Sequence, residues 1–109
     1  MSRADYEIKP ETLQQKMEAK ERFVLLDVRR HDEVAISSLP GAIHIPIDEI
    51  EERAGELDAG AETVVYCHHG VRSLSVTVYL RNLGFRDVTS LAGGIDLWSQ
   101  RIDPSVPRY

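Results

Sequence analysis

Thr63-Val64-Val65-Tyr66-Cys67-His68-His69-Gly70-Val71-Arg72-Ser73 is an apolar run that passes directly into a short loop containing one glycine. A short, continuous apolar run of this kind is typical of a strand buried on both faces of a sheet. A helical period follows from Ser73 to Leu83, and Gly84 is a natural stop for a helix. The stretch therefore predicts a strand, a tight loop and a helix in direct succession.

The same alternation of apolar strands and helix-period segments extends in both directions from this stretch. Further strands are predicted at residues 23–26, 42–45 and 88–91, with residues 6–8 as an edge strand. A first helix is predicted to begin at Pro10. A second is predicted from an apolar stripe of Ile47, Ile50, Ala54 and Leu57, with a capping box at Asp48 and Glu51. A last short helix is predicted around Ile95, Leu97 and Trp98. Because strands that alternate with helices favour right-handed crossovers, residues 1–109 predict one α/β domain. It would hold a mainly parallel five-stranded sheet flanked by helices on both faces, with an irregular tail from Asp103.

Length and charge exclude several classes of protein. The chain has 109 residues, a formal net charge of −5 and one cysteine. A chain of this length can bury a core without disulfides or a structural metal. The acidic balance argues against a nucleic-acid partner, which needs a net-positive face, whereas a small anionic substrate still fits a locally positive pocket. No apolar run approaches the roughly 18 residues of a membrane-spanning helix, and the start lacks a secretory signal. We therefore expect a cytoplasmic protein with no membrane partner.

The lone thiol lies where a predicted strand turns into the N-terminus of a helix. Sites in open α/β sheets form beyond the carboxyl ends of the strands, and at Cys67 the backbone N–H groups and the helix dipole favour anions and thiolates. Gly70 lets the loop curl so that successive N–H groups point inward, and Arg72 adds a permanent positive charge. The functional interpretation is a nucleophilic Cys67; the alternative is a buried core cysteine at the end of an apolar strand.

Other polar residues near the carboxyl ends of the strands are assigned less direct roles. Adjacent histidines beside one cysteine do not match the ligand spacing of zinc sites, so we expect His68 and His69 to line the loop rim rather than to bind a metal; the alternative is that they are simply solvated. Asp27 and Arg29 are predicted to have a structural role near the site, because a carboxylate that ends a buried strand commonly pairs with nearby backbone or an arginine. Gly93-Gly94 indicates a tight turn.

Together these segments resemble a single-domain rhodanese over residues 25–98. The matching motifs, in order, are Asp27-Val28-Arg29 with Glu33, Pro40-Gly41-Ala42 with Ile43-His44-Ile45-Pro46, Tyr66-Cys67-His68-His69-Gly70-Val71-Arg72-Ser73, Leu83-Gly84-Phe85, and Leu91-Ala92-Gly93-Gly94 with Trp98. The resemblance implies a sulfurtransferase in which Cys67 carries a persulfide and in which His68, His69, Gly70, Val71 and Arg72 form the loop that cradles the substrate. It implies no cofactor. One departure is Ser37-Ser38-Leu39, where the family often has Gly-His-Ile.

The activity implied by this resemblance is that of a thiosulfate sulfurtransferase. A small anionic donor such as thiosulfate would give its outer sulfur to Cys67, and cyanide, a thiol or a sulfur-accepting protein would remove it. Two alternatives remain. The first is a non-catalytic module of the same fold that carries sulfur or binds a partner. The second is a cysteine phosphatase or arsenate reductase. Enzymes of these classes have a similar motif with five residues between the cysteine and the arginine, whereas four residues separate Cys67 from Arg72.

Overall fold

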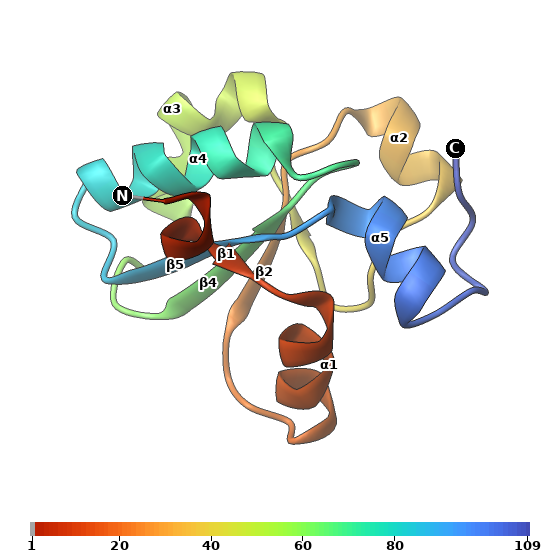
Figure 1. Cartoon of the computed structure of the whole chain (residues 1–109). Helices are drawn as coiled ribbons and strands as arrows, with labels where there is room; N and C mark the ends of the chain where they lie inside the picture. Colours follow the sequence, from red (N-terminus) through yellow and green to blue (C-terminus); the bar gives the residue numbers. More distant parts are fainter. Residues whose placement is uncertain (1) are drawn as a thin grey trace.

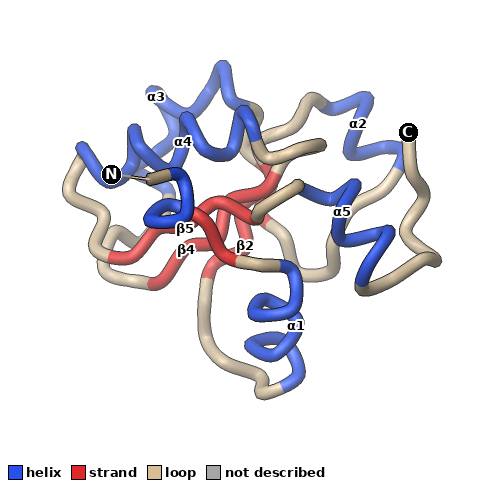
Figure 2. Tube along the Cα trace, viewed as in Figure 1, coloured by secondary structure: helices blue, strands red, loops and turns tan. Residues whose placement is uncertain are grey.

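The computed structural model describes residues 2–109, and its centre is one parallel sheet of five strands (Figures 1 and 2). The strands are β1 (Glu7–Ile8), β2 (Val24–Asp27), β3 (Ile43–His44), β4 (Glu62–Tyr66) and β5 (Asp87–Leu91), in the spatial order β1-β5-β4-β2-β3. Each neighbouring pair is parallel. The predicted α/β fold class is therefore confirmed, and the five predicted strands are found within one or two residues of their expected bounds.

Helices cover both faces of the sheet, as predicted. They are α1 (Pro10–Glu18), α2 (His31–Ile36), α3 (Ile50–Arg53), α4 (Val71–Asn82) and α5 (Gly94–Arg101), with 3₁₀ turns at Arg3–Tyr6, Ile47–Glu49 and Ala54–Glu56. Leu26 and Val65 pack on one face under α3 and α4, whereas Leu25 and Val64 pack on the other face with residues of α1 and α5. Side chains that alternate along β2 and β4 thus enter two separate cores, which is why consecutive residues in the middle of each strand are apolar.

Helix α4 begins two residues earlier than the sequence indicated. Gly70 adopts a left-handed conformation with φ of +95° and caps the helix, so helical geometry begins at Val71. The helix buries Val76 and Leu80, but Leu83 is 52% exposed. The prediction that Leu83 shares the buried face of this helix is therefore wrong, because the helix ends before that position. The early start puts the first turn of α4 directly over Cys67.

Two other segments also differ from expectation. The predicted stripe from Ile47 to Leu57 is not one helix: a 3₁₀ turn, the four-residue α3 and a second 3₁₀ turn follow each other. The predicted capping box does not form, since Glu49 occupies the N-cap without a side-chain bond. The short helix α2 was not predicted, because its six residues offer little apolar period and it buries an ionised residue, Glu33.

The tail beyond α5 has no regular secondary structure, as predicted from Asp103 onward. It runs back past α5 and brings the C-terminal residue beside α2 (Figure 1). Within residues 2–109, the helices are all too short or too polar to cross a membrane.

Candidate active site at the Cys67 loop

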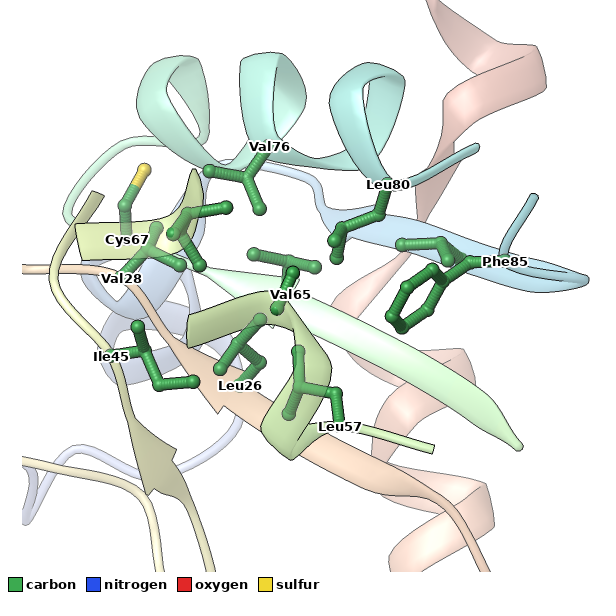
Figure 3. Close-up of a cluster of buried hydrophobic side chains, with 12 residues drawn as sticks. Leu26, Val28, Ile45, Leu57, Val65, Cys67, Val76, Leu80 and Phe85 are labelled. Carbon is green, nitrogen blue, oxygen red and sulfur yellow. The ribbon is translucent and has the colours of Figure 1, made fainter. Parts of the chain in front are cut away.

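Cys67 follows the last residue of β4 and is only 1% exposed. Figure 3 shows it at one end of the apolar cluster that lies under α4. Its Sγ accepts hydrogen bonds from the backbone N–H groups of Gly70, at 3.2 Å, and Ser73, at 3.3 Å. Donors of this kind stabilise a charged sulfur, whether a thiolate or a persulfide anion. The inward-pointing N–H groups expected from Gly70 are therefore found.

A buried pair of serines continues the polar contacts of the sulfur. The thiol lies 3.3 Å from the Ser73 Oγ, to which it donates, and the Ser73 Oγ lies 2.7 Å from the Ser90 Oγ of β5. Both serines are fully buried. When the sulfur is ionised, the Ser73 hydroxyl can reverse and donate to it. Sequence reasoning assigned no role to either serine; the only signal for Ser73 was its place at the end of the cysteine motif.

The turn before α5 packs directly against the loop. Gly94 has φ of +62°, and a Cβ built on it would lie 2.3 Å from the His68 carbonyl oxygen and 2.5 Å from that of Cys67. The N–H of Ile95 donates to the Cys67 carbonyl at 2.9 Å, and that of Asp96 to the His68 carbonyl at 3.1 Å. The predicted tight turn at Gly93-Gly94 is confirmed, and its lack of side chains lets α5 fix the first two carbonyls of the loop.

The cation of the loop is held by a glutamate from α2. The Arg72 guanidinium donates to both carboxylate oxygens of Glu33, at 2.6 and 2.9 Å. This contact with Arg72 is the main reason that the pKa of Glu33 lies far below its ordinary value. The positive charge predicted from Arg72 is present but is paired. Val71, which precedes Arg72, is 66% exposed, so its side chain does not pack in the core beside Cys67.

Asp27 and Arg29 form a fully buried ion pair beside the loop. The Arg29 Nη2 lies 2.7 Å from the Asp27 Oδ2, and Arg29 also donates to the carbonyl of Ser37 at 2.7 Å. Neither side chain contacts the sulfur through a hydrogen bond in the described residues. The pairing of Asp27 with Arg29 is present, and the structural role expected of the pair stays a prediction. The Ser37 contribution comes from its backbone, so the departure from the family at residues 37–38 leaves this bond intact.

The rings of the two loop histidines lie against each other, with their planes tilted by 31°. Their ring centroids lie 3.9 Å apart, and the other side of His68 is covered by the ring of Tyr109 at 3.8 Å with an interplanar angle of 8°. Burial and the neighbouring His69 lower the pKa of His68, so its ring is neutral at neutral pH. Among residues 2–109, no group of three or more His, Cys, Asp or Glu side chains is placed to hold a metal ion.

A surface cavity lies beside the loop on the side of Arg72. Its volume is about 260 Å³. The residues that line it are Val28, Arg30, Pro46, Ile47, Asp48 and Arg72. Val28 also belongs to the buried cluster that contains Cys67, and Arg72 belongs to the cysteine loop, so two lining residues connect the cavity with the surroundings of the sulfur. Arg30, Ile47 and Asp48 had no predicted part in the site.

The structure thus has a parallel α/β sheet with a cysteine at a strand-to-helix turn, and two backbone N–H groups donate to the cysteine sulfur. These features define a class of α/β proteins with a cysteine at the carboxyl edge of the sheet. Comparison with known proteins narrows this class. The model of the Rhodanese-like domain family matches residues 9–101, and the chain belongs to that family.

Relatives in this family support the assignment. The Bacillus subtilis protein that carries the name "Putative sulfurtransferase YtwF" is 39% identical over 98 residues, which cover 90% of this chain and 94% of the relative. The thiosulfate sulfurtransferase GlpE of Coxiella burnetii is 34% identical over 72% of this chain and 74% of its own. A rhodanese-like domain protein from Staphylococcus aureus superposes with a TM-score of 0.82 at 27% identity, over 95% of this chain and 98% of that one. This protein is thus a member of a sulfurtransferase family with the rhodanese-like fold.

Proposed function

We propose that the protein transfers a sulfane sulfur through a persulfide on Cys67. The observation that carries the proposal is the pair of backbone N–H groups, from Gly70 and Ser73, that converge on the Cys67 Sγ. A group placed to receive these bonds before any substrate arrives is preorganised to hold negative charge. The family of the chain and the names of its relatives support the same reaction class.

The proposed reaction has two displacement steps. The Cys67 thiolate attacks the outer sulfur of thiosulfate, a Cys67–sulfur bond forms as the sulfur–sulfur bond of the donor breaks, and sulfite leaves with the electron pair. A thiolate or cyanide then attacks the outer sulfur of the persulfide and releases the Cys67 thiolate. Oxidation states balance across the two steps, so the reaction needs no cofactor.

Each residue of the loop has a part in this scheme. Gly70 and Ser73 hold the inner sulfur, and the first-turn N–H groups of Val71 and Arg72 have no intrahelical acceptor, so they are free to bind the outer one. Arg72, already oriented by Glu33, faces the cavity of about 260 Å³ through which the donor and acceptor approach. His68 and His69 form the opposite rim, with His68 neutral at neutral pH.

Thiosulfate as donor, and cyanide or a thiol as acceptor, are the finer part of the proposal. The name of the Coxiella burnetii relative favours thiosulfate, and the short loop between Cys67 and Arg72 suits a terminal sulfur better than a phosphate group. The acceptor in the cell would be a small thiol or a sulfur-accepting protein. A carrier and an enzyme share the same persulfide, and turnover with a small acceptor separates them.

The test is intact mass spectrometry after incubation with thiosulfate. We expect the wild-type chain to gain one sulfur, about 32 Da as a reversible persulfide, and to lose it to cyanide or a thiol with the appearance of thiocyanate or the corresponding persulfide. Cys67→Ser should show neither adduct nor turnover, whereas Ser105→Ala, on the exposed tail, is the matched control. An adduct in Cys67→Ser would overturn the assignment; an adduct on the wild type that no acceptor removes at a catalytic rate would favour the carrier.

A further inference from the structure

The tail at residues 103–109 lies outside the segment that the family model matches, which ends at residue 101. It is nevertheless attached to the body of the protein at several points. The Ser99 Oγ donates to the Val106 carbonyl at 2.6 Å, and Val106 packs against the core on the α5 side of the sheet. Arg108 forms two bonds with Asp96, at 2.9 and 3.3 Å. The tail therefore has a defined course that ends beside the Cys67 loop.

Tyr109 contacts the two ends of that loop in different ways. Its ring stacks on His68, the residue that follows Cys67, with centroids 3.8 Å apart and planes 8° from parallel. Its hydroxyl donates to the Glu33 Oε2 at 2.8 Å, and Glu33 holds Arg72 near the other end of the loop. One side chain from the tail thus reaches the start of the loop directly and its end through a single carboxylate.

The protonation states of these groups suit the direction of the bonds. Burial raises the pKa of Tyr109 to about 12, so its hydroxyl keeps the proton that it donates at neutral pH. Glu33 is ionised, because Arg72 lowers its pKa well below the ordinary range. The Tyr109 oxygen also accepts a bond from the Arg29 Nη1 at 3.0 Å, which ties it to the buried pair of Arg29 and Asp27.

We propose that the tail carries Tyr109 to the sulfur-transfer site of this chain and that Tyr109 is a positioning residue for the Cys67 loop. This inference rests on the proposed function of that loop. The Tyr109 ring fixes the plane of His68 and so the peptide next to Cys67, and the Tyr109 hydroxyl fixes the Glu33 carboxylate and so the direction of the Arg72 guanidinium. The tail also covers His68 and leaves the cavity beside Arg72 as the open side of the loop.

The two contacts of Tyr109 predict two separable kinetic effects. Tyr109→Phe keeps the stacked ring and removes the hydroxyl, so Arg72 is less well held; we expect the KM for thiosulfate to rise about threefold with little change in kcat, since the binding of the donor is weakened. Tyr109→Leu removes the ring as well, and misplacement of the loop N–H groups should also lower kcat, by about tenfold. A residue that merely added stability would change the fraction of folded protein, and it would leave both KM and kcat, expressed per folded protein, unchanged.

Amide hydrogen exchange on the same variants gives a readout that does not depend on activity. We expect Tyr109→Leu to speed exchange at residues 68–73 by about tenfold through local opening, with Tyr109→Phe intermediate. Amides of β4 should be unchanged. Ser105→Ala is the matched control, because Ser105 is exposed on the same tail and its hydroxyl donates to Asp103 of that tail. The loop exchange and the kinetics of this variant should equal those of the wild type.

The outcomes separate the two proposals. If the wild-type chain forms no persulfide, the proposed function fails, and exchange at residues 68–73 alone decides whether Tyr109 orders the loop. If the persulfide forms but Tyr109→Leu leaves both the loop exchange and the kinetic constants unchanged, the positioning role of Tyr109 is wrong. A uniform increase in exchange throughout the sheet would also overturn it, because it would indicate a loss of global stability rather than of loop order.

Discussion

Gly94→Ala should damage the Cys67 loop far more than Gly84→Ala, although both glycines have a left-handed backbone. Gly84 has φ of +99°, and a Cβ built there would meet no atom within 4 Å. Gly94 has φ of +62°, and its Cβ would lie 2.3 Å from the His68 carbonyl oxygen and 2.5 Å from that of Cys67. The two substitutions thus impose a similar backbone penalty but differ in what the new methyl group contacts.

The structure sets the size of the difference. A left-handed alanine costs about 1–2 kcal/mol at either position, and this strain alone would favour alanine at Gly94, whose φ lies nearer the left-handed minimum of about +57°. At Gly94, however, ordinary contact begins at 3.4 Å, so the backbone of the loop must move by about 1 Å. We assign a further cost of about 1–3 kcal/mol to this overpacking, and a displacement of about 1 Å at reacting groups reduces the rate by about 100-fold.

Urea denaturation and persulfide formation from thiosulfate, measured on both variants, test this reasoning. We expect Gly84→Ala to keep the wild-type rate and to lose about 1–2 kcal/mol of stability. Gly94→Ala should lose more stability and about two orders of magnitude in rate, measured on the folded fraction. The argument is refuted if Gly94→Ala reacts at the rate of Gly84→Ala, because the close packing of α5 on the loop would then have no influence on the sulfur.

Three further predictions follow from the site. Asp27→Asn should lower the free energy of unfolding, measured in urea, by about 3 kcal/mol, because the buried Arg29 loses its counter-charge. The folded fraction should still form the persulfide, and loss of the adduct in folded protein would contradict a structural role. Glu33→Gln should lower the free energy of unfolding by about 2 kcal/mol and make it less sensitive to acid. The depressed pKa of Glu33 adds stability that is present above the unfolded pKa of about 4.3 and is lost as pH falls through the folded pKa. If the variant loses stability at low pH in the same way as the wild type, this argument is refuted. One residue inserted between Gly70 and Arg72 should lower thiosulfate turnover by widening the loop, and unchanged kinetics would exclude loop size as the discriminator.

The sequence predicted the sheet well because its strands have few alternatives. The middle residues of β2 and β4 are apolar on both faces of the sheet, and short runs of this kind are typical of central parallel strands. The same pattern predicted the crossovers and hence the edge of the sheet at which the loop lies. Short helices were less predictable: α2 is held mainly by ion pairs around Glu33, which leave no apolar period to detect.

The loop was predictable in its centre and not in its surroundings. Cys67, Gly70 and Arg72 stand in one contiguous motif, so their proximity follows from the sequence alone. Ser90, Glu33 and Tyr109 come from three other parts of the chain, and each is brought to the loop by packing that no local pattern encodes. A serine in a strand or a tyrosine in an irregular tail gives no signal of its own, because both residue types are common at such places.

The pairing of Arg72 with Glu33 changes what makes this site suited to an anion. On a chain with a net charge of −5, a free guanidinium would be the obvious attractor, yet the Arg72 charge is compensated by a carboxylate at 2.6 Å. The uncompensated positive ends near the sulfur are those of backbone N–H groups, two of which already bind the Cys67 Sγ. These dipoles are fixed by Gly70, by the first turn of α4 and by the packing of α5 on the loop, so they stabilise charge without reorganising when it arrives. In the proposed reaction, Arg72 would therefore act mainly by orienting the donor, through a guanidinium that Glu33 holds in the lining of the cavity. The affinity of the site for an anion would then depend on how rigidly the loop is held.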